Sequence, residues 1–284
     1  MNHVSPDFSK TGYSILTSFV EQHELASLRA CVDEIASLPP DPIMARPGNH
    51  LFPLRWNDAI VARLLNSSRR RAALQSALHS PDLQPPDLRW LSAYVSTKEP
   101  GTPALWWHQD WWCWDHPISF RRAPAQVALL CYLADTNDRC GALRVLPGSH
   151  RRNTPIHAIL PEAHGHGANC VPEAHPAMRD ADGQVTIEAC AGDAVLIDYR
   201  LLHGTHANLS AGRRDCILLS FIPAWRDLPV EILAHLILHP ALPGESEGQA
   251  RGICGYDDLL PTFDGVPASL PINRVPPAQF HAAD

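Results

Sequence analysis

The 284-residue sequence contains no hydrophobic run that approaches the roughly 20 residues needed for a membrane-spanning helix. Residues 1–7 also lack the apolar centre of a secretory signal peptide. The eight cysteines are scattered and include no Cys-x-x-Cys pair, which is the usual spacing of redox and zinc-binding cysteines. We therefore expect a cytoplasmic protein with reduced thiols and no membrane partner.

Positive charge is scarce as well. Lys and Arg total 23 against 30 Asp and Glu, which gives a formal net charge of −7 and a pI near 6.1. This balance provides no electrostatic attraction to nucleic acid or to an anionic membrane. The short arginine runs 69–71, 121–122 and 151–152 could hold a phosphorylated or CoA-bearing substrate, but solvated surface is the better interpretation. We expect a small-molecule substrate and no nucleic-acid partner.

Hydrophobic residues make up 45% of the sequence, enough for a sizeable core, and the 27 prolines favour ordered loops over long helices. A β barrel with added helices can reach this length as one domain. We therefore predict a single domain over residues 1–284, with a helical part over about 18–80, a β core over about 88–225 and a C-terminal extension over about 226–284. A monomer and a homodimer are equally compatible with the sequence.

Two helices are predicted in the N-terminal part. The first spans 19–38, ends before Pro39 and could be capped by Ser18, and the second spans about 57–78, with residues 41–54 as a loop between them. Short β segments separated by turns follow over 88–96, 105–111, 125–134, 143–146, 185–190, 194–198 and 214–223. This pattern predicts a mostly β protein with N-terminal helices, folded as a sandwich or barrel.

One predicted strand carries His108 and Asp110 among several tryptophans. Side chains two residues apart on a strand point to the same face, so this pair can offer an imidazole nitrogen and a carboxylate oxygen to one metal ion. The pair alone is a weak signal, because His and Asp at this spacing are usually solvated neighbours. Its meaning depends on a third ligand elsewhere in the chain.

His203 is the best candidate for that third ligand, because it follows the apolar strand 194–198. Two histidines and one carboxylate, with other positions open, are typical of non-haem iron(II) oxygenases, whereas structural zinc sites have four protein ligands. His206 is a rival for His203. Arg214 lies eleven residues after His203 (214 minus 203), and a guanidinium at the start of the next strand can bind a carboxylate bidentately. In the family resemblance described below, this spacing favours His203 over His206.

Further motifs stand in a fixed order along the chain: Gly12-Tyr13-Ser14-Ile15-Leu16, His108-Gln109-Asp110, the segment 141–150, Gly192-Asp193, and His203-Gly204-Thr205 with Asn208 and Arg214. Together they resemble the phytanoyl-CoA dioxygenase family of iron(II)- and 2-oxoglutarate-dependent oxygenases, over roughly residues 8–225. The resemblance implies a double-stranded β-helix, which is the jelly-roll or cupin-like fold. It also implies that His108, Asp110 and His203 bind iron(II), and that Arg214 and Thr205 hold the distal carboxylate of 2-oxoglutarate.

The activity implied by the resemblance is oxidation of an unactivated C–H bond in a small-molecule metabolite. Hydroxylation is the default outcome, with O2 as second cosubstrate and succinate and CO2 as products. Gln126 is a further candidate for the cosubstrate pocket, and Trp112 and Arg55 are candidates for contacting the substrate. A cupin-like metal-dependent hydrolase or isomerase that does not use 2-oxoglutarate, or a catalytically idle metal-binding protein, are the alternatives.

Two segments are left open by the sequence. Residues 150–183 contain several histidines and a cysteine at irregular spacing, which matches no closed zinc motif and favours a loop over the active-site mouth. The proline-rich tail over 253–284 could fold back over the β core or contact a second subunit.

Overall fold

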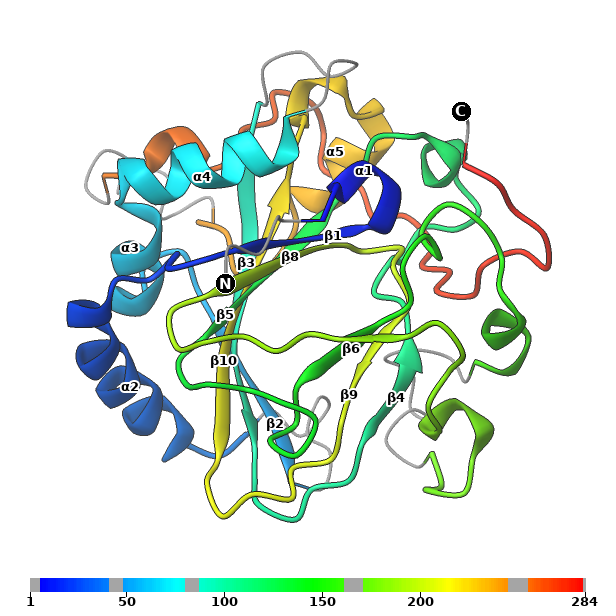
Figure 1. Ribbon diagram of the computed structural model, residues 1–284. Coiled ribbons are helices and arrows are strands. Elements are labelled where there is room, and N and C mark those ends of the chain that lie inside the picture. The colour runs from blue at the N-terminus through cyan, green and yellow to red at the C-terminus, as the bar shows by residue number, and fades with distance from the viewer. Residues whose placement is uncertain (1–5, 41–47, 80–86, 161–170, 245–254, 283–284) are drawn as a thin grey trace.

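The computed structural model describes residues 6–40, 48–79, 87–160, 171–244 and 255–282. These residues form two antiparallel sheets with few helices, so the prediction of a mostly β protein is confirmed. The larger sheet has the strand order β1-β8-β5-β10-β3-β2 and the smaller one β4-β9-β6-β7. Helices α2, α3 and α4 lie on one side of the larger sheet and the smaller sheet lies on the other (Figure 1).

The larger sheet supplies most of the core. All six residues of its central strand β5 are buried, because helices cover one face and the smaller sheet the other. The predicted loop over 41–54 was wrong in part, because it contains the edge strand β2. Pro53 argues against a strand in the sequence, but proline is tolerated in a strand at the edge of a sheet. The strands are β1 (Tyr13–Leu16), β2 (Asn49–Leu54), β3 (Arg89–Lys98), β5 (Val127–Tyr132), β8 (Ala194–Asp198) and β10 (Arg214–Ile222).

The smaller sheet is built from short strands. The strand predicted over 105–111 ends at His108, because the backbone N–H groups of Asp110 and Trp111 donate to the carbonyl of Tyr199 instead of to a partner strand. Asp110 therefore lies on a turn, and the strand alternation assumed from the sequence does not apply to it. The strands are β4 (Leu105–His108), β6 (Leu143–Val145), β7 (Val185–Thr186) and β9 (His203–Thr205).

Two predicted helix boundaries were wrong. The first long helix begins after Glu21, whose carboxylate forms a capping box with Glu24, and not at Ser18, which has a positive φ of 51°. The predicted helix over 57–78 is two helices, because Ser67 caps a new one by accepting from the N–H of Arg70. The α-helices are α1 (Phe8–Thr11), α2 (Gln22–Ala36), α3 (Ala59–Leu65), α4 (Ser68–Leu78) and α5 (Val230–Leu236).

The C-terminal extension folds back onto this chain. Asn273 donates its N–H to the carbonyl of Trp112 and accepts from the N–H of Trp114, so it lies beside the segment that follows β4. Short 3₁₀ helices complete the structure over Pro117–Phe120, Pro155–Ile159, Pro176–Met178, Trp225–Asp227 and Asp257–Leu259. Among the described residues, no helix has the length and apolarity required to cross a membrane.

Candidate metal centre

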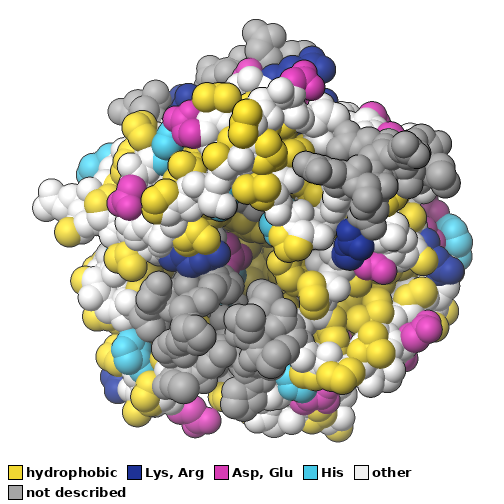
Figure 2. Space-filling view, turned by 180° about the vertical axis from the view of Figure 1, so that it is seen from behind, with side chains coloured by type: hydrophobic (Ala, Val, Ile, Leu, Met, Phe, Trp, Pro, Cys, Tyr) yellow, Lys and Arg dark blue, Asp and Glu magenta, His cyan; other side chains and the backbone are white. Residues whose placement is uncertain are grey.

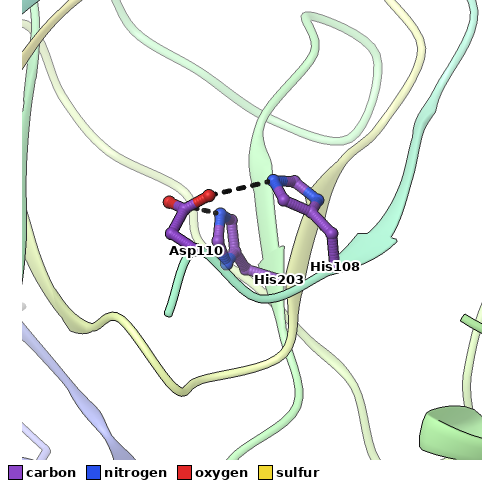
Figure 3. A group of neighbouring side chains, drawn as sticks. All are labelled: His108, Asp110 and His203. Atoms are coloured by element: carbon purple, nitrogen blue, oxygen red, sulfur yellow. Dashed lines mark ion pairs between the residues drawn. The ribbon is translucent and has the colours of Figure 1, made fainter. Parts of the chain in front are cut away.

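The structure brings the three predicted metal ligands together. His108 ends β4, His203 begins β9, and the two residues are paired across the smaller sheet. The carboxylate of Asp110 points towards both imidazole rings, with its oxygens 3.7 Å from Nε2 of His108 and 3.5 Å from Nε2 of His203 (Figure 3). One possible ligand atom from each residue lies within 4.8 Å of the other two.

Gly204 explains how the two histidines come so close. A Cβ atom at this position would lie 2.7 Å from the carbonyl oxygen of Leu105 and 3.0 Å from that of Trp106. Any larger residue would therefore push β9 away from β4. Glycine between His203 and Thr205 allows the strands to approach until the centroids of the two imidazole rings are 4.2 Å apart.

The hydrogen bonds of both histidines suit metal binding. Nδ1 of His108 lies 2.9 Å from the carbonyl oxygen of Trp106, and Nδ1 of His203 lies 3.0 Å from that of Leu201. A carbonyl can only accept, so each Nδ1 carries the proton and each Nε2 keeps its lone pair for a metal. Ligand atoms about 2.1 Å from one ion at right angles lie about 3 Å apart, so the separations found here need only a small adjustment. The residues therefore fit iron(II).

The turn that carries Asp110 is held by a buried network. The side-chain amide of Gln109 donates to the carbonyl of Arg200, next to Tyr199, which accepts from the N–H of Asp110. Arg200 is itself paired with Asp198, Nη2 to Oδ2, at 2.7 Å, and both side chains are 2% exposed. This pair fixes the turn against which the ligand loop rests.

Other histidines have different roles. Nε2 of His206 lies 2.8 Å from the hydroxyl of Thr186, outside the cluster formed with His203. In the predicted mouth loop, His157 and His175 accept backbone N–H groups at the starts of 3₁₀ helices. The other candidates there, over 161–170, lie outside the described residues. Within the described part of the chain, the triad is the only group able to hold a metal.

Arg214 begins β10 and is buried. Among the described residues, its Nε atom has no hydrogen-bond partner and its guanidinium forms no ion pair. An arginine buried in this way is costly without an anion. Its neighbour Arg213 is different, because it faces outwards and pairs with Asp33 and Asp215. The buried and unsatisfied guanidinium of Arg214 thus fits an anionic cosubstrate.

Sequence reasoning missed Lys98. This residue ends β3 opposite Arg214 and is fully buried, and its Nζ donates to the hydroxyl of Thr205 at 3.1 Å and to the carbonyl of Pro103 at 2.6 Å. Arg214, Thr205 and Lys98 therefore come from three strands that meet at one place. One signal was available in the sequence. Lys98 is one of only two lysines, and it stands at the end of a segment of mostly uncharged residues that reads as a strand.

A cavity of about 430 Å³ lies next to Asp110, a volume typical of small-molecule sites. Trp112 and Gln126 line it together, because the indole N–H donates to Oε1 of Gln126 at 3.0 Å. The amide of Gln126 also donates to Ser220, so its described partners belong to the cavity wall and not to the Arg214 group. Arg55 is exposed and is not among the residues that line the cavity.

The C-terminal extension supplies the other wall of this cavity, through residues that the sequence did not point to. Burial lowers the pKa of His239 to about 4 and also lowers the pKa of His235. Both imidazoles are therefore neutral near neutral pH. One face of the molecule is hollowed at its centre, with hydrophobic side chains on the rim and charged ones beside it (Figure 2). The lining residues from the extension are His235, Leu236, His239, Ile272 and Arg274.

Several known proteins are similar to this chain. An ectoine dioxygenase of Nocardia farcinica is 27% identical over 230 residues, which cover 75% of each chain. A probable alpha-ketoglutarate-dependent hypophosphite dioxygenase of Stutzerimonas stutzeri is 21% identical over 229 residues, or 77% of each chain. HygX from Streptomyces hygroscopicus, solved with nickel, 2-oxoglutarate and hygromycin B, has a similar fold, with a TM-score of 0.57 at 21% identity over 76% of this chain and 84% of HygX.

The family is decided by a sequence model of phytanoyl-CoA dioxygenase (PhyH), which matches residues 8–216. The chain belongs to the phytanoyl-CoA dioxygenase family. The resemblance seen in the sequence motifs is thereby confirmed. With its His-Asp-His cluster, this family member is an iron(II)- and 2-oxoglutarate-dependent dioxygenase.

Proposed function

We propose that this dioxygenase hydroxylates a C–H bond of a small molecule bound in the cavity beside Asp110. The observation that carries the proposal is the presence of a metal-binding cluster in the smaller sheet together with a buried, unsatisfied Arg214 at the start of β10 in the larger sheet. When bound, iron(II) and 2-oxoglutarate activate O2 for attack on the C–H bond, and the cosubstrate leaves as succinate and CO2. Each residue below has a part in placing these groups.

His108, Asp110 and His203 are the iron ligands in this proposal. The two imidazoles bind through Nε2 while their Nδ1–H groups stay fixed on backbone carbonyls. The carboxylate of Asp110 partly balances the charge of the ion. An ion held by these three side chains alone would have room for the cosubstrate and O2.

Arg214 binds the distal carboxylate of 2-oxoglutarate, with Thr205 and Lys98 beside it. Thr205 already accepts from Nζ of Lys98, so its own hydroxyl proton is available for the carboxylate. Lys98 adds a second positive charge to the same place, and its burial strengthens that charge's attraction for an anion. Gln126 takes no part in this group and serves the substrate cavity with Trp112.

We further propose that the two sheets are the halves of a double-stranded β-helix and that residues 1–284 form one domain. The antiparallel pairing of all strands and the similarity to HygX support this arrangement. Relatives named for ectoine and hypophosphite support a small polar substrate. We expect the protein to act in the cytoplasm as a monomer or homodimer.

Anaerobic titration tests the proposal. Addition of 2-oxoglutarate to the iron(II)-loaded protein is expected to produce the weak visible band of the chelated cosubstrate. Arg214→Ala should weaken 2-oxoglutarate binding by about 100-fold, because it removes the charge partner of a buried carboxylate. The matched control is Arg213→Ala, which removes an outward-facing arginine and should change binding by less than about twofold. A folded, iron-loaded protein without the band would instead favour a hydrolase, an isomerase or a binding role.

A further inference from the structure

The charge of the substrate cavity is uneven. Among the residues that line it, only Asp110 and Arg274 carry a full charge near neutral pH, because His235 and His239 are neutral. Asp110 faces the two histidines of the cluster, where a bound metal ion would balance its charge. Arg274 has no such partner and forms no ion pair with the described residues. The guanidinium of Arg274 is therefore the charged group that the cavity offers to a bound substrate.

The guanidinium of Arg274 is held beside the metal centre by the main chain. Its Nη1 donates to the carbonyl oxygen of Asp110 at 3.0 Å. Asn273, the preceding residue, is fixed by backbone hydrogen bonds to Trp112 and Trp114. One of the five N–H donors of the arginine is thus used for anchoring, which leaves the rest of its planar fork for a ligand.

The two histidines add neutral donors to the same wall. Nδ1 of His235 accepts from the N–H of Leu270 at 3.0 Å, and Nδ1 of His239 accepts from the N–H of Ala241 at 3.2 Å. Each neutral imidazole therefore carries its proton on Nε2. Neither Nε2 atom has a partner among the described residues. Hydrogen-bond donors line this wall, whereas a cationic substrate would need acceptors there.

Much of the remaining lining is apolar, beside the polar side chains of Ser92, Tyr94, Gln126, Tyr199 and Ser220. Trp112 stacks on His235 with 4.5 Å between ring centroids and 29° between ring planes. Leu51, Leu91 and Leu218 are among the other lining residues. Such walls suit the carbon skeleton of a ring or a branched chain.

We propose that the substrate is a small organic carboxylate whose anionic group is bound by Arg274, with its carbon skeleton packed against Trp112. The inference rests on the proposed oxygenase function and adds the substrate class to it. Arg274 lies outside residues 8–216, so this anion site belongs to the C-terminal extension and not to the segment that defines the family. Because Arg274 is bound to the main chain of an iron ligand, the carbon that is oxidised lies close to the carboxylate.

Matched acid and amide pairs test the proposal. Binding of benzoate, cyclohexanecarboxylate and their primary amides is measured by tryptophan fluorescence, on protein loaded anaerobically with iron(II) and 2-oxoglutarate. In the wild type the acids are expected to bind at least about tenfold more tightly than the amides, because an arginine fork favours a carboxylate. Arg274→Gln should abolish this preference, and Arg274→Lys should keep part of it. The control Arg226→Gln removes an exposed arginine and should leave the preference intact.

The outcomes are separable. Equal binding of acids and amides, no binding of either acid, or a preference that survives in Arg274→Gln would overturn the substrate class. Loss of 2-oxoglutarate binding in Arg274→Gln would overturn it as well, since Arg274 would then hold the cosubstrate. A wild type that shows the acid preference without the cosubstrate band would contradict the oxygenase function alone.

Discussion

The β core and the C-terminal extension contribute to the active site in different ways. In the core, His108, His203 and the Arg214 group stand on strands that are hydrogen-bonded into two sheets, and Asp110 follows just after β4. In the extension, the cavity residues stand on one short helix and on irregular segments that lean against the core. Sheets hold reacting groups at fixed separations, whereas loops change readily without disturbing the sheets. The core therefore supplies the metal cluster and the Arg214 group, and the extension supplies one wall of the substrate cavity.

The attachment of the two regions agrees with this division. Inside the core, Asp198 and Arg200 form a pair in which both side chains are buried. Between helix α4 and the extension, Arg71 pairs with Asp258, whose side chain is 68% exposed. Exposed pairs contribute little to stability, whereas breaking a buried pair strands a charge in the interior. At these two ion pairs, a substitution in the extension therefore costs less stability than one in the core.

The largest expected effect comes from removing an iron ligand of the core. His203→Ala should lower iron-dependent turnover by more than about 1,000-fold, since loss of even an outer hydrogen-bond partner of a metal ligand costs about 10–100-fold. His206→Ala is the matched control, because His206 lies three residues further along and bonds to Thr186 outside the cluster. Iron content and succinate release measure both variants. Equal losses in the two would contradict the assignment of His203.

The next effect compares the two ion pairs. Asp198→Ala should lower the free energy of unfolding by about 3–5 kcal/mol, because it leaves the guanidinium of Arg200 buried without its partner. Asp258→Ala should lower it by less than about 1 kcal/mol, because that pair is solvated. Urea denaturation of the two variants gives both values. A loss at Asp258 as large as that at Asp198 would show that the extension is as firmly built in as the core.

The core also differs from the extension in how far its site could be predicted from sequence. The sequence pointed to four core residues through their types and their spacing along the chain: His108, Asp110, His203 and Arg214. Even there, the reason given for Asp110 was incomplete, since a hydrogen bond to Tyr199 places it on a turn and not on the strand. Spacing identified which residues meet, and the three-dimensional contacts explain how.

Residues that reach the site through contacts between distant parts of the chain show no comparable pattern in the sequence. Arg274 reaches the cavity because Asn273 pairs with Trp112 and Trp114, about 160 positions earlier in the chain. Lys98 is on β3 of the larger sheet and bonds to Thr205 on β9 of the smaller sheet, so the contact joins two strands that are not paired. Helix and strand periodicity describes neighbours within one element, so pairings of this kind lie beyond it.

The smallest expected effect concerns the pH dependence of stability in the extension. Burial lowers the pKa of His239 to about 4 in the folded protein, whereas an unfolded histidine titrates near 6.5. Between these values the unfolded chain binds more protons, so stability is complete above about pH 6.5 and is lost as the pH falls towards 4. His239→Asn removes the titrating group but keeps an acceptor for the N–H of Ala241. Between pH 7 and pH 4, unfolding free energies should therefore fall by about 3 kcal/mol less in the variant than in the wild type. An unchanged slope in His239→Asn would mean that this wall of the cavity opens to water in solution.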